Sequence, residues 1–174
     1  MSDSPKPDDK HVDAYERMLE RTRHFLEVTE DDLSLKLHYA VDAAKDKAHE
    51  LGELSREEAE KVADYLRRDI HDAAEYLTEE GKVLNDWLRF DIELIEQRFM
   101  DWFSEVVDTT KLELLQLANR DKQVALWQSG EVSGPGTLVC EQCGHQQHFH
   151  HSTKIPPCPQ CGHTTFYRHE PQND

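Results

Sequence analysis

Two segments of the same pattern, Cys-x-x-Cys-Gly-His, limit most strongly what this chain can fold into. Fourteen residues separate the two cysteine pairs, which together hold all four cysteines of the 174-residue sequence. Cysteines on either side of a two-residue turn can bind one ion, and two such turns complete a tetrahedral shell. A glycine after each pair suits a turn that needs positive φ. The spacing is a strong zinc signal, and it predicts one structural Zn²⁺ with four ligands: Cys140, Cys143, Cys158 and Cys161.

Other roles for the cysteines have less support. A disulfide framework needs an oxidising compartment, and the polar N-terminus contains no apolar segment typical of a secretory signal. A thioredoxin-like motif uses one pair in a βαβ setting, which the pattern does not show. Iron in a rubredoxin-like site, and with it a redox carrier, stays open as an alternative. Four thiolates leave no coordination position for water or substrate, so we expect a structural metal and no enzyme.

Composition and charge favour long, solvated helices. Charged residues make up 32% of the chain and hydrophobic residues 37%, and the net charge is −16. Residues 137–174 carry a net charge of only −1, so the acidity lies before them. An acidic surface repels phosphate backbones, which argues against nucleic-acid binding by the N-terminal region. No apolar run approaches the ~20 residues of a membrane span. We therefore expect a soluble, cytoplasmic protein.

Apolar residues recur at helical spacing through most of 10–122, which predicts an acidic antiparallel bundle of long amphipathic helices. The first helix is expected from Lys10 to Val28, after a disordered tail at 1–9. Thr29 can cap a second helix, which has an acidic first turn and ends at Gly52.

A third helix is expected to start at a capping box. Ser55 and Glu58 have the spacing of that motif, and the apolar stripe continues to Leu77. The short link before Ser55 predicts that the second and third helices form an antiparallel hairpin.

A fourth helix, expected near 83–107, carries two apolar lines and so presents a wide apolar face. The simpler interpretation places this helix at the centre of the bundle. The alternative leaves one line for a partner or for a second copy of the chain, which would make a homo-oligomer. Thr109 and Thr110 are expected to interrupt the helix, and a shorter helix is expected over 111–119.

The C-terminal region is predicted to be a small β zinc ribbon. A glycine-rich connector is expected over 123–136, the ribbon over 137–169, and a tail over 170–174. Strands are expected at 147–150 and 165–167. The ribbon has 33 residues, fewer than the ~40 that usually fold without metal or disulfides, so zinc would supply the missing stability.

Two further groups of polar residues were considered. The histidines near the first cysteine pair could bind a second metal, although we favour ordinary exposed residues: His145, His148, His150 and His151. The basic pair Arg67-Arg68 is expected to form intrahelical ion pairs with Asp64, Asp72 or Glu75. The sequence contains no phosphate-binding loop, dinucleotide fingerprint or nucleophile elbow.

Taken together, these motifs resemble the bacterial zinc-ribbon family of the YbeL type, a domain of unknown function. The resemblance covers nearly the whole chain and depends on six motifs: Gly52–Arg56, Leu66–Ile70, Ser129–Val132, Leu138–Cys143, Cys158–His163 and the aromatic Phe166. It implies a helical N-terminal region, a C-terminal zinc ribbon with the four cysteines as ligands, and a cytoplasmic setting. It implies no activity.

The favoured function is therefore a non-enzymatic binding or adaptor protein, and the expected partner is another, basic protein. The residues proposed to contact the partner are the apolar residues of the ribbon: Phe149, Ile155, Phe166 and Tyr167. The alternative, nucleic-acid binding, could involve only the ribbon, which has a single lysine and a single arginine.

Overall fold

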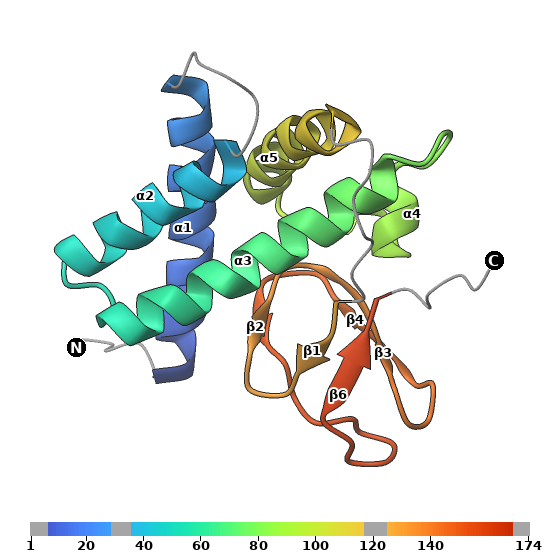
Figure 1. The fold of residues 1–174 in the computed structure, drawn as a ribbon. Helices are drawn as coiled ribbons and strands as arrows, with labels where there is room; N and C mark the ends of the chain where they lie inside the picture. The colour runs from blue at the N-terminus through green and yellow to red at the C-terminus, as the bar shows by residue number, and fades with distance from the viewer. Residues whose placement is uncertain (1–6, 29–35, 117–124, 169–174) are drawn as a thin grey trace.

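The computed structural model describes residues 7–28, 36–116 and 125–168. The first two ranges, called here the helical body, form helices, and the last, called the C-terminal module, forms strands (Figure 1). The helices are α1 (Pro7–Val28), α2 (Lys36–Glu50), α3 (Arg56–Leu77), α4 (Leu84–Leu88), the 3-10 helix η1 (Ile92–Leu94) and α5 (Gln97–Gln116). The strands are β1 (Trp127–Gln128), β2 (Val132–Ser133), β3 (Gly136–Cys140), β4 (Gln146–Phe149), β5 (Thr153–Lys154) and β6 (Thr165–Tyr167).

Helices α2 and α3 form the predicted antiparallel hairpin. Gly52 follows α2 with a φ of 71°, a conformation that glycine adopts without strain. The predicted capping box is confirmed: the Glu58 amide donates to Ser55 Oγ at 3.1 Å, and the Ser55 amide donates to Glu58 Oε2 at 2.8 Å. Helix α1 crosses behind α2 and α3 instead of running beside them (Figure 1), so the helical body is not a simple antiparallel bundle.

The fourth helix predicted near 83–107 is broken, and this expectation was wrong. Helix α4 ends at Leu88, and the next residue, Arg89, has a left-handed φ of 62° and an amide that donates to the Asn85 carbonyl oxygen at 3.0 Å. Helix α5 then starts a new direction at Gln97. The break lets the two helices pack on each other. Trp87 of α4 stacks on Phe103 of α5, with 5.8 Å between ring centroids, and both lie in the helical core.

Helix α5 also continues through the interruption expected at Thr109 and Thr110. Their hydroxyls donate to the carbonyl oxygens of Glu105 at 3.1 Å and Val106 at 2.8 Å. Such bonds to the preceding turn allow threonine within a helix. The shorter helix expected over 111–119 is thus the end of α5 as far as Gln116, and the rest lies outside the described residues.

Three other expectations fall partly outside the described residues. The Thr29 cap and the acidic first turn lie in 29–35, and α2 is described from Lys36 onward. There, Glu113 of α5 accepts a hydrogen bond from the Leu37 amide at 3.1 Å, so another helix caps the start of α2. The tail expected at 1–9 contributes residues 7–9 to α1, while 1–6 and the tail at 170–174 are not described.

The C-terminal module contains a four-stranded antiparallel sheet in the order β1-β6-β3-β4 and a separate β2-β5 pair. The connector expected over 123–136 is therefore wrong in large part, because β1 and β2 belong to this module. Trp127 pairs with Phe166 across the sheet. The strands expected at 147–150 and 165–167 correspond to β4 and β6. The module has its own small core: Trp127, Leu138, Cys140, Ile155, Cys158 and Phe166.

Candidate metal centre and the contact that supports it

The two cysteine turns have the same backbone geometry, as their sequences predicted. In the first, the Gly144 amide donates to the Cys140 carbonyl oxygen at 3.0 Å, and the Cys140 amide donates to the His145 carbonyl oxygen at 2.9 Å. The second turn repeats both bonds from Gly162 and Cys158, at 2.8 and 2.9 Å. The two glycines have φ angles of 75° and 76°, so both turns need the residue that tolerates positive φ.

The turns bring the four predicted ligands together. The sulfurs of Cys140 and Cys161 lie 3.6 Å apart, as do those of Cys143 and Cys158, and all four Sγ atoms lie within 4.8 Å of one another. A tetrahedral zinc site with Zn–S bonds of ~2.3 Å has sulfurs ~3.8 Å apart. The cysteines are free, not disulfide-bonded. The residues present therefore fit one tetrahedral S4 metal ion.

Backbone amides also favour the ionised form of one ligand. Desolvation opposes ionisation of the Cys158 thiol, but hydrogen bonds from the amides of Cys161 and Gln160, together with those from the neighbouring cysteine thiols, lower its pKa to about 6. The thiolate is the form that binds metal. The same amides would continue to orient the sulfur once an ion is bound.

The alternative second metal site receives no support. Among the residues that the structure describes, the four cysteines are the only group of three or more side chains placed to hold an ion. His148 Nδ1 lies 2.8 Å from Thr137 Oγ1. The His150 ring instead packs edge-on against Phe90, with 4.8 Å between ring centroids.

The partner contacts predicted on the ribbon need correction. Ile155 and Phe166 are 2% and 0% exposed and lie in the core of the C-terminal module, so neither can contact a partner. Phe149 and Tyr167 are half-buried, and Phe149 packs against the same core. A module this small uses most of its apolar side chains to form its own interior.

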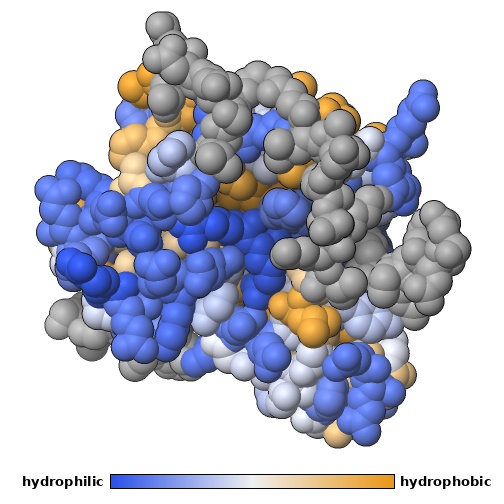
Figure 2. All heavy atoms as spheres, viewed as in Figure 1, coloured by the Kyte–Doolittle hydropathy of each residue, from blue (hydrophilic) through white to orange (hydrophobic). Residues whose placement is uncertain are grey.

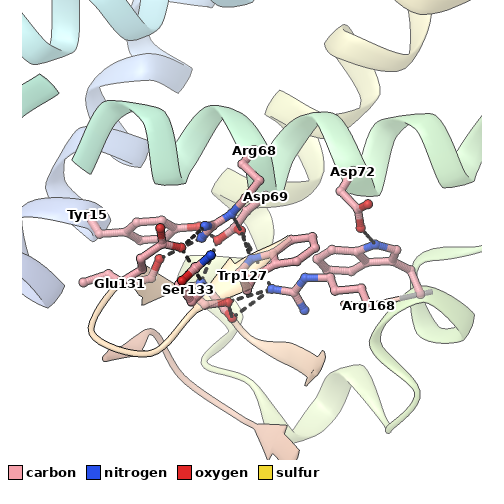
Figure 3. A network of polar contacts seen from close by, with 12 residues as sticks. Tyr15, Arg68, Asp69, Asp72, Trp127, Glu131, Ser133 and Arg168 are labelled. Atoms are coloured by element: carbon pink, nitrogen blue, oxygen red, sulfur yellow. Dashed lines mark hydrogen bonds and ion pairs between the residues drawn. The ribbon is translucent and has the colours of Figure 1, made fainter. Parts of the chain in front are cut away.

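A buried polar network joins the C-terminal module to α3 (Figure 3), and no sequence argument found it. Asp69 of α3 is fully buried and accepts a hydrogen bond from the neighbouring Arg68 Nε at 3.3 Å and three from other elements: from the Tyr15 hydroxyl at 2.6 Å, Trp127 Nε1 at 2.8 Å and the Gly134 amide at 2.8 Å. These three distant donors come from α1, β1 and the segment before β3. One carboxylate thus connects two helices with the C-terminal module.

Arg168, which follows β6, is the second centre of this network. It is 1% exposed, and its Nη2 lies 2.7 Å from Ser133 Oγ and 3.9 Å from Asp69 Oδ1. Its guanidinium lies over the rings of Trp87 and Trp127, at 4.5 and 4.9 Å from their centroids. Aromatic faces attract a guanidinium most strongly where water is excluded.

Arg68 also contacts this network, and its ion pairs are with Asp69 at 3.3 Å and with Glu131, not with the expected Asp64, Asp72 or Glu75. Its guanidinium lies 4.8 Å from the Trp127 ring centroid, pairs with Glu131, and donates to the Val132 carbonyl oxygen at 3.1 Å. Trp127 is therefore in contact with two arginines. Arg67 does pair with Asp64, at 3.0 Å, and also with Asp42.

Burial shifts the pKa values of three groups in this network. Burial, and then the charge of Asp69, raise the pKa of Tyr15 well above its ordinary value. Burial lowers the pKa of Arg168, against the attraction of Asp69 and Asp72. Burial also raises the pKa of Asp72, which accepts a hydrogen bond from Trp87 Nε1 at 2.8 Å. The network therefore fixes the position of the C-terminal module on the helices.

A sequence signal for Asp69 did exist. It lies three residues after Leu66 and one before Ile70, which places a carboxylate within the apolar stripe of α3. A buried carboxylate requires partners, but the sequence does not indicate which distant residues provide them.

Comparison with known proteins agrees with the cysteine geometry. A family model described as a zinc-ribbon containing domain matches residues 24–170. The chain belongs to this family. It is 31% identical over 110 residues to the uncharacterized protein YbeL of Escherichia coli strain K12, and equally to its counterparts in strains O6:H1 and O157:H7. The match covers 63% of this chain and 65% of these relatives. No solved structure matches. In the described residues, no helix has the length and apolar character needed to cross a membrane.

Proposed function

We propose that this member of the zinc-ribbon family is a non-enzymatic adaptor that binds other proteins, with one structural zinc ion held by its four cysteines. The observation that carries the proposal is the set of four sulfurs within 4.8 Å of one another. Four thiolates fill a tetrahedral shell and leave no position for substrate. The bound metal stabilises a fold, and function depends on the surface of that fold.

The zinc ion would supply the energy that the C-terminal module lacks. When bound, it joins the turn after β3 to the turn before β6. Structural zinc contributes about 10–16 kcal/mol in small finger peptides, and the core of this module consists of six buried residues. Zinc binding requires reduced cysteines, which fits a reducing compartment such as the cytoplasm.

The helical body would present a charged platform to a partner. The net charge of the chain is −16, and the face over α2 and α3 is mostly hydrophilic (Figure 2). Such a surface attracts basic partners and repels nucleic acid. The network around Asp69 would hold the platform and the C-terminal module as one unit, so that a partner could contact both.

The alternatives have less support from the contacts. Nucleic-acid binding through the ribbon needs a track of cations, and of the two cationic side chains after residue 136, Arg168 is buried against two tryptophans. For a rubredoxin-like redox carrier, no specific observation favours iron over zinc.

The proposal is tested by affinity capture from a cell extract with three proteins: the intact chain, a Cys140→Ser/Cys143→Ser variant, and a Gln142→Ser control. Gln142 lies exposed between the two replaced cysteines, so the control changes the same turn without removing a ligand. We expect specific partners with the intact chain and the control, and their loss with the cysteine variant. Identical partner sets for all three proteins would contradict a role for the C-terminal module in binding.

A further inference from the structure

Strand β4 is an open edge of the four-stranded sheet. It pairs with β3 on one side, and on the other side no strand of the described residues lies next to it. The Cys140 amide donates to the His145 carbonyl oxygen, and hydrogen-bonded pairs alternate along an antiparallel ladder. The backbone groups of Gln146 and His148 therefore point away from β3. In the described parts of the chain, no backbone partner of these two residues lies on that side.

This edge lacks most of the features that prevent strand pairing. Natural edge strands are protected by short length, charged side chains, proline, bulges or a covering element, and among the described residues β4 shows only the first, with a length of four residues. Residues 146–149 are Gln-Gln-His-Phe, without charge or proline, and are paired in regular register with β3. The opposite edge, β1, is different: Trp127 is buried against Arg68, and the Gln128 amide donates to Glu131 at 3.1 Å.

The helical body supports the strand from one face. Thr137 pairs with His148 across the ladder, and its hydroxyl donates to the Leu88 carbonyl oxygen at 2.7 Å. The Phe90 ring packs against the rings of His148 and His150. In Figure 1, β3 and β4 accordingly lie close below α4. A strand held in this way is ready to pair without first being ordered, which lowers the entropic cost of binding.

The charge of the chain indicates the kind of partner. In the segment around Phe90, which packs on β4, Asp91 and Glu93 are exposed acidic residues against one exposed cation, Arg89. A second copy of the chain would bring a further net charge of −16 and would be repelled. A basic segment would be attracted.

We propose that the β4 edge binds an extended, basic peptide segment of another protein by strand addition. The backbone groups of Gln146 and His148 would form the hydrogen bonds, and the net charge of −16 would favour lysine and arginine in the bound segment. This inference depends on the proposed binding function and adds the surface and the class of partner to it.

The test uses the full zinc-loaded chain and a pool of fluorescein-labelled seven-residue peptides in which Val, Ile, Thr or Tyr alternates with Lys or Arg. Fluorescence anisotropy measures binding to His148→Pro and His148→Ala. Both variants lose the imidazole, but only proline removes the outward amide, and an edge strand tolerates proline at such a position. We expect His148→Pro to weaken binding at least tenfold relative to His148→Ala. An acidic pool, with Asp or Glu replacing Lys or Arg, should not bind.

A second measurement applies even if the proline variant loses zinc or fails to fold. Two versions of the basic peptides are added to the unaltered chain: one is N-methylated at the odd-numbered backbone amides and the other at the even-numbered ones. Because a strand pairs through one edge, methylation of one set should abolish binding and that of the other should preserve it. Equal binding by both sets, no saturable binding of the basic pool, or equal binding of the acidic pool would overturn the proposal. A dimer that dissociates in His148→Pro would also overturn it, by assigning the edge to a second copy.

These outcomes are separable from those of the proposed function. If affinity capture finds partners that need the cysteines but not the His148 amide, the adaptor role stands and the β4 edge is not its binding surface. If the intact chain captures no partner although the peptides bind, the adaptor role fails and the strand-addition site remains.

Discussion

Replacing Asp69 with alanine should cause one of the largest losses of stability available from a single substitution in this protein. The carboxylate is 0% exposed and accepts hydrogen bonds from Tyr15, Trp127 and Gly134 at 2.6–2.8 Å, and Arg168 lies 3.9 Å away. The alanine variant leaves three buried donors without an acceptor and removes one of the two carboxylates that attract the buried Arg168.

The magnitude follows from those contacts. An unsatisfied buried donor costs about 1–3 kcal/mol, and removing one partner of a buried ion pair costs about 3–5 kcal/mol. These costs overlap, since water and local relaxation reduce both, so we expect Asp69→Ala to lower the free energy of unfolding by about 4–5 kcal/mol. Asp69→Asn keeps one acceptor oxygen but loses the charge, and we expect a loss of about 2–3 kcal/mol.

The measurement is urea unfolding of the reduced, zinc-supplemented protein, followed by tryptophan fluorescence. Asp64→Ala is the matched control, because Asp64 lies on the same helix, is 63% exposed and pairs only at the surface with Arg67. It should change stability by at most ~0.5 kcal/mol. The reasoning about the network is refuted if Asp69→Ala costs less than ~1.5 kcal/mol or no more than the control.

Three further predictions concern other contacts. Gly136→Ala would place a Cβ 1.8 Å from Arg168 Nη1, whereas the Cβ of the control Gly130→Ala meets only open space. Because both glycines have positive φ, the difference between the two variants reports the clash alone. In thermal unfolding, Gly136→Ala should lower the free energy of unfolding by ~2 kcal/mol or more beyond the control. Glu113→Ala should lower stability by about 1 kcal/mol in urea unfolding through loss of the cap on α2. Burial raises the pKa of Glu113, so its ionisation opposes folding, and wild-type stability relative to Glu113→Gln should fall as pH rises above ~4.5. Hydrogen bonds from the Ser55 amide and from Lys10 lower the pKa of Glu58 from 4.5 to about 2. The stability advantage of wild type over Glu58→Gln should therefore be complete above pH ~4.5 and disappear as pH falls to ~2. A stability difference that does not change across that interval would contradict the role of the Glu58 charge.

Local patterns were sufficient for the features whose determinants lie close together in the sequence. The cysteine turns need only six consecutive residues each, and the Ser55 capping box needs four. Such motifs specify their own backbone geometry through hydrogen bonds within the motif. The ligand set and the start of α3 were therefore predictable.

Features that depend on distant contacts were not predictable. Arg89 carries no local signal for a left-handed conformation, and tertiary packing of Trp87 and Phe103 overrides the continuous helical pattern. Strand β1 forms because Trp127 pairs with Phe166, a residue far along the chain. The partners of Asp69 likewise come from four separate segments, so its position in an apolar stripe indicated a buried carboxylate but not its role.

The central claim, one zinc ion that organises the C-terminal module, is tested most directly by metal analysis of purified, reduced protein, combined with hydrogen exchange before and after chelation. The account predicts one zinc per chain, and rapid exchange of the amides in 125–168 once the metal is removed, while α2 and α3 keep most of their protection. Protein without stoichiometric metal, or a C-terminal module that stays protected after chelation, would contradict it.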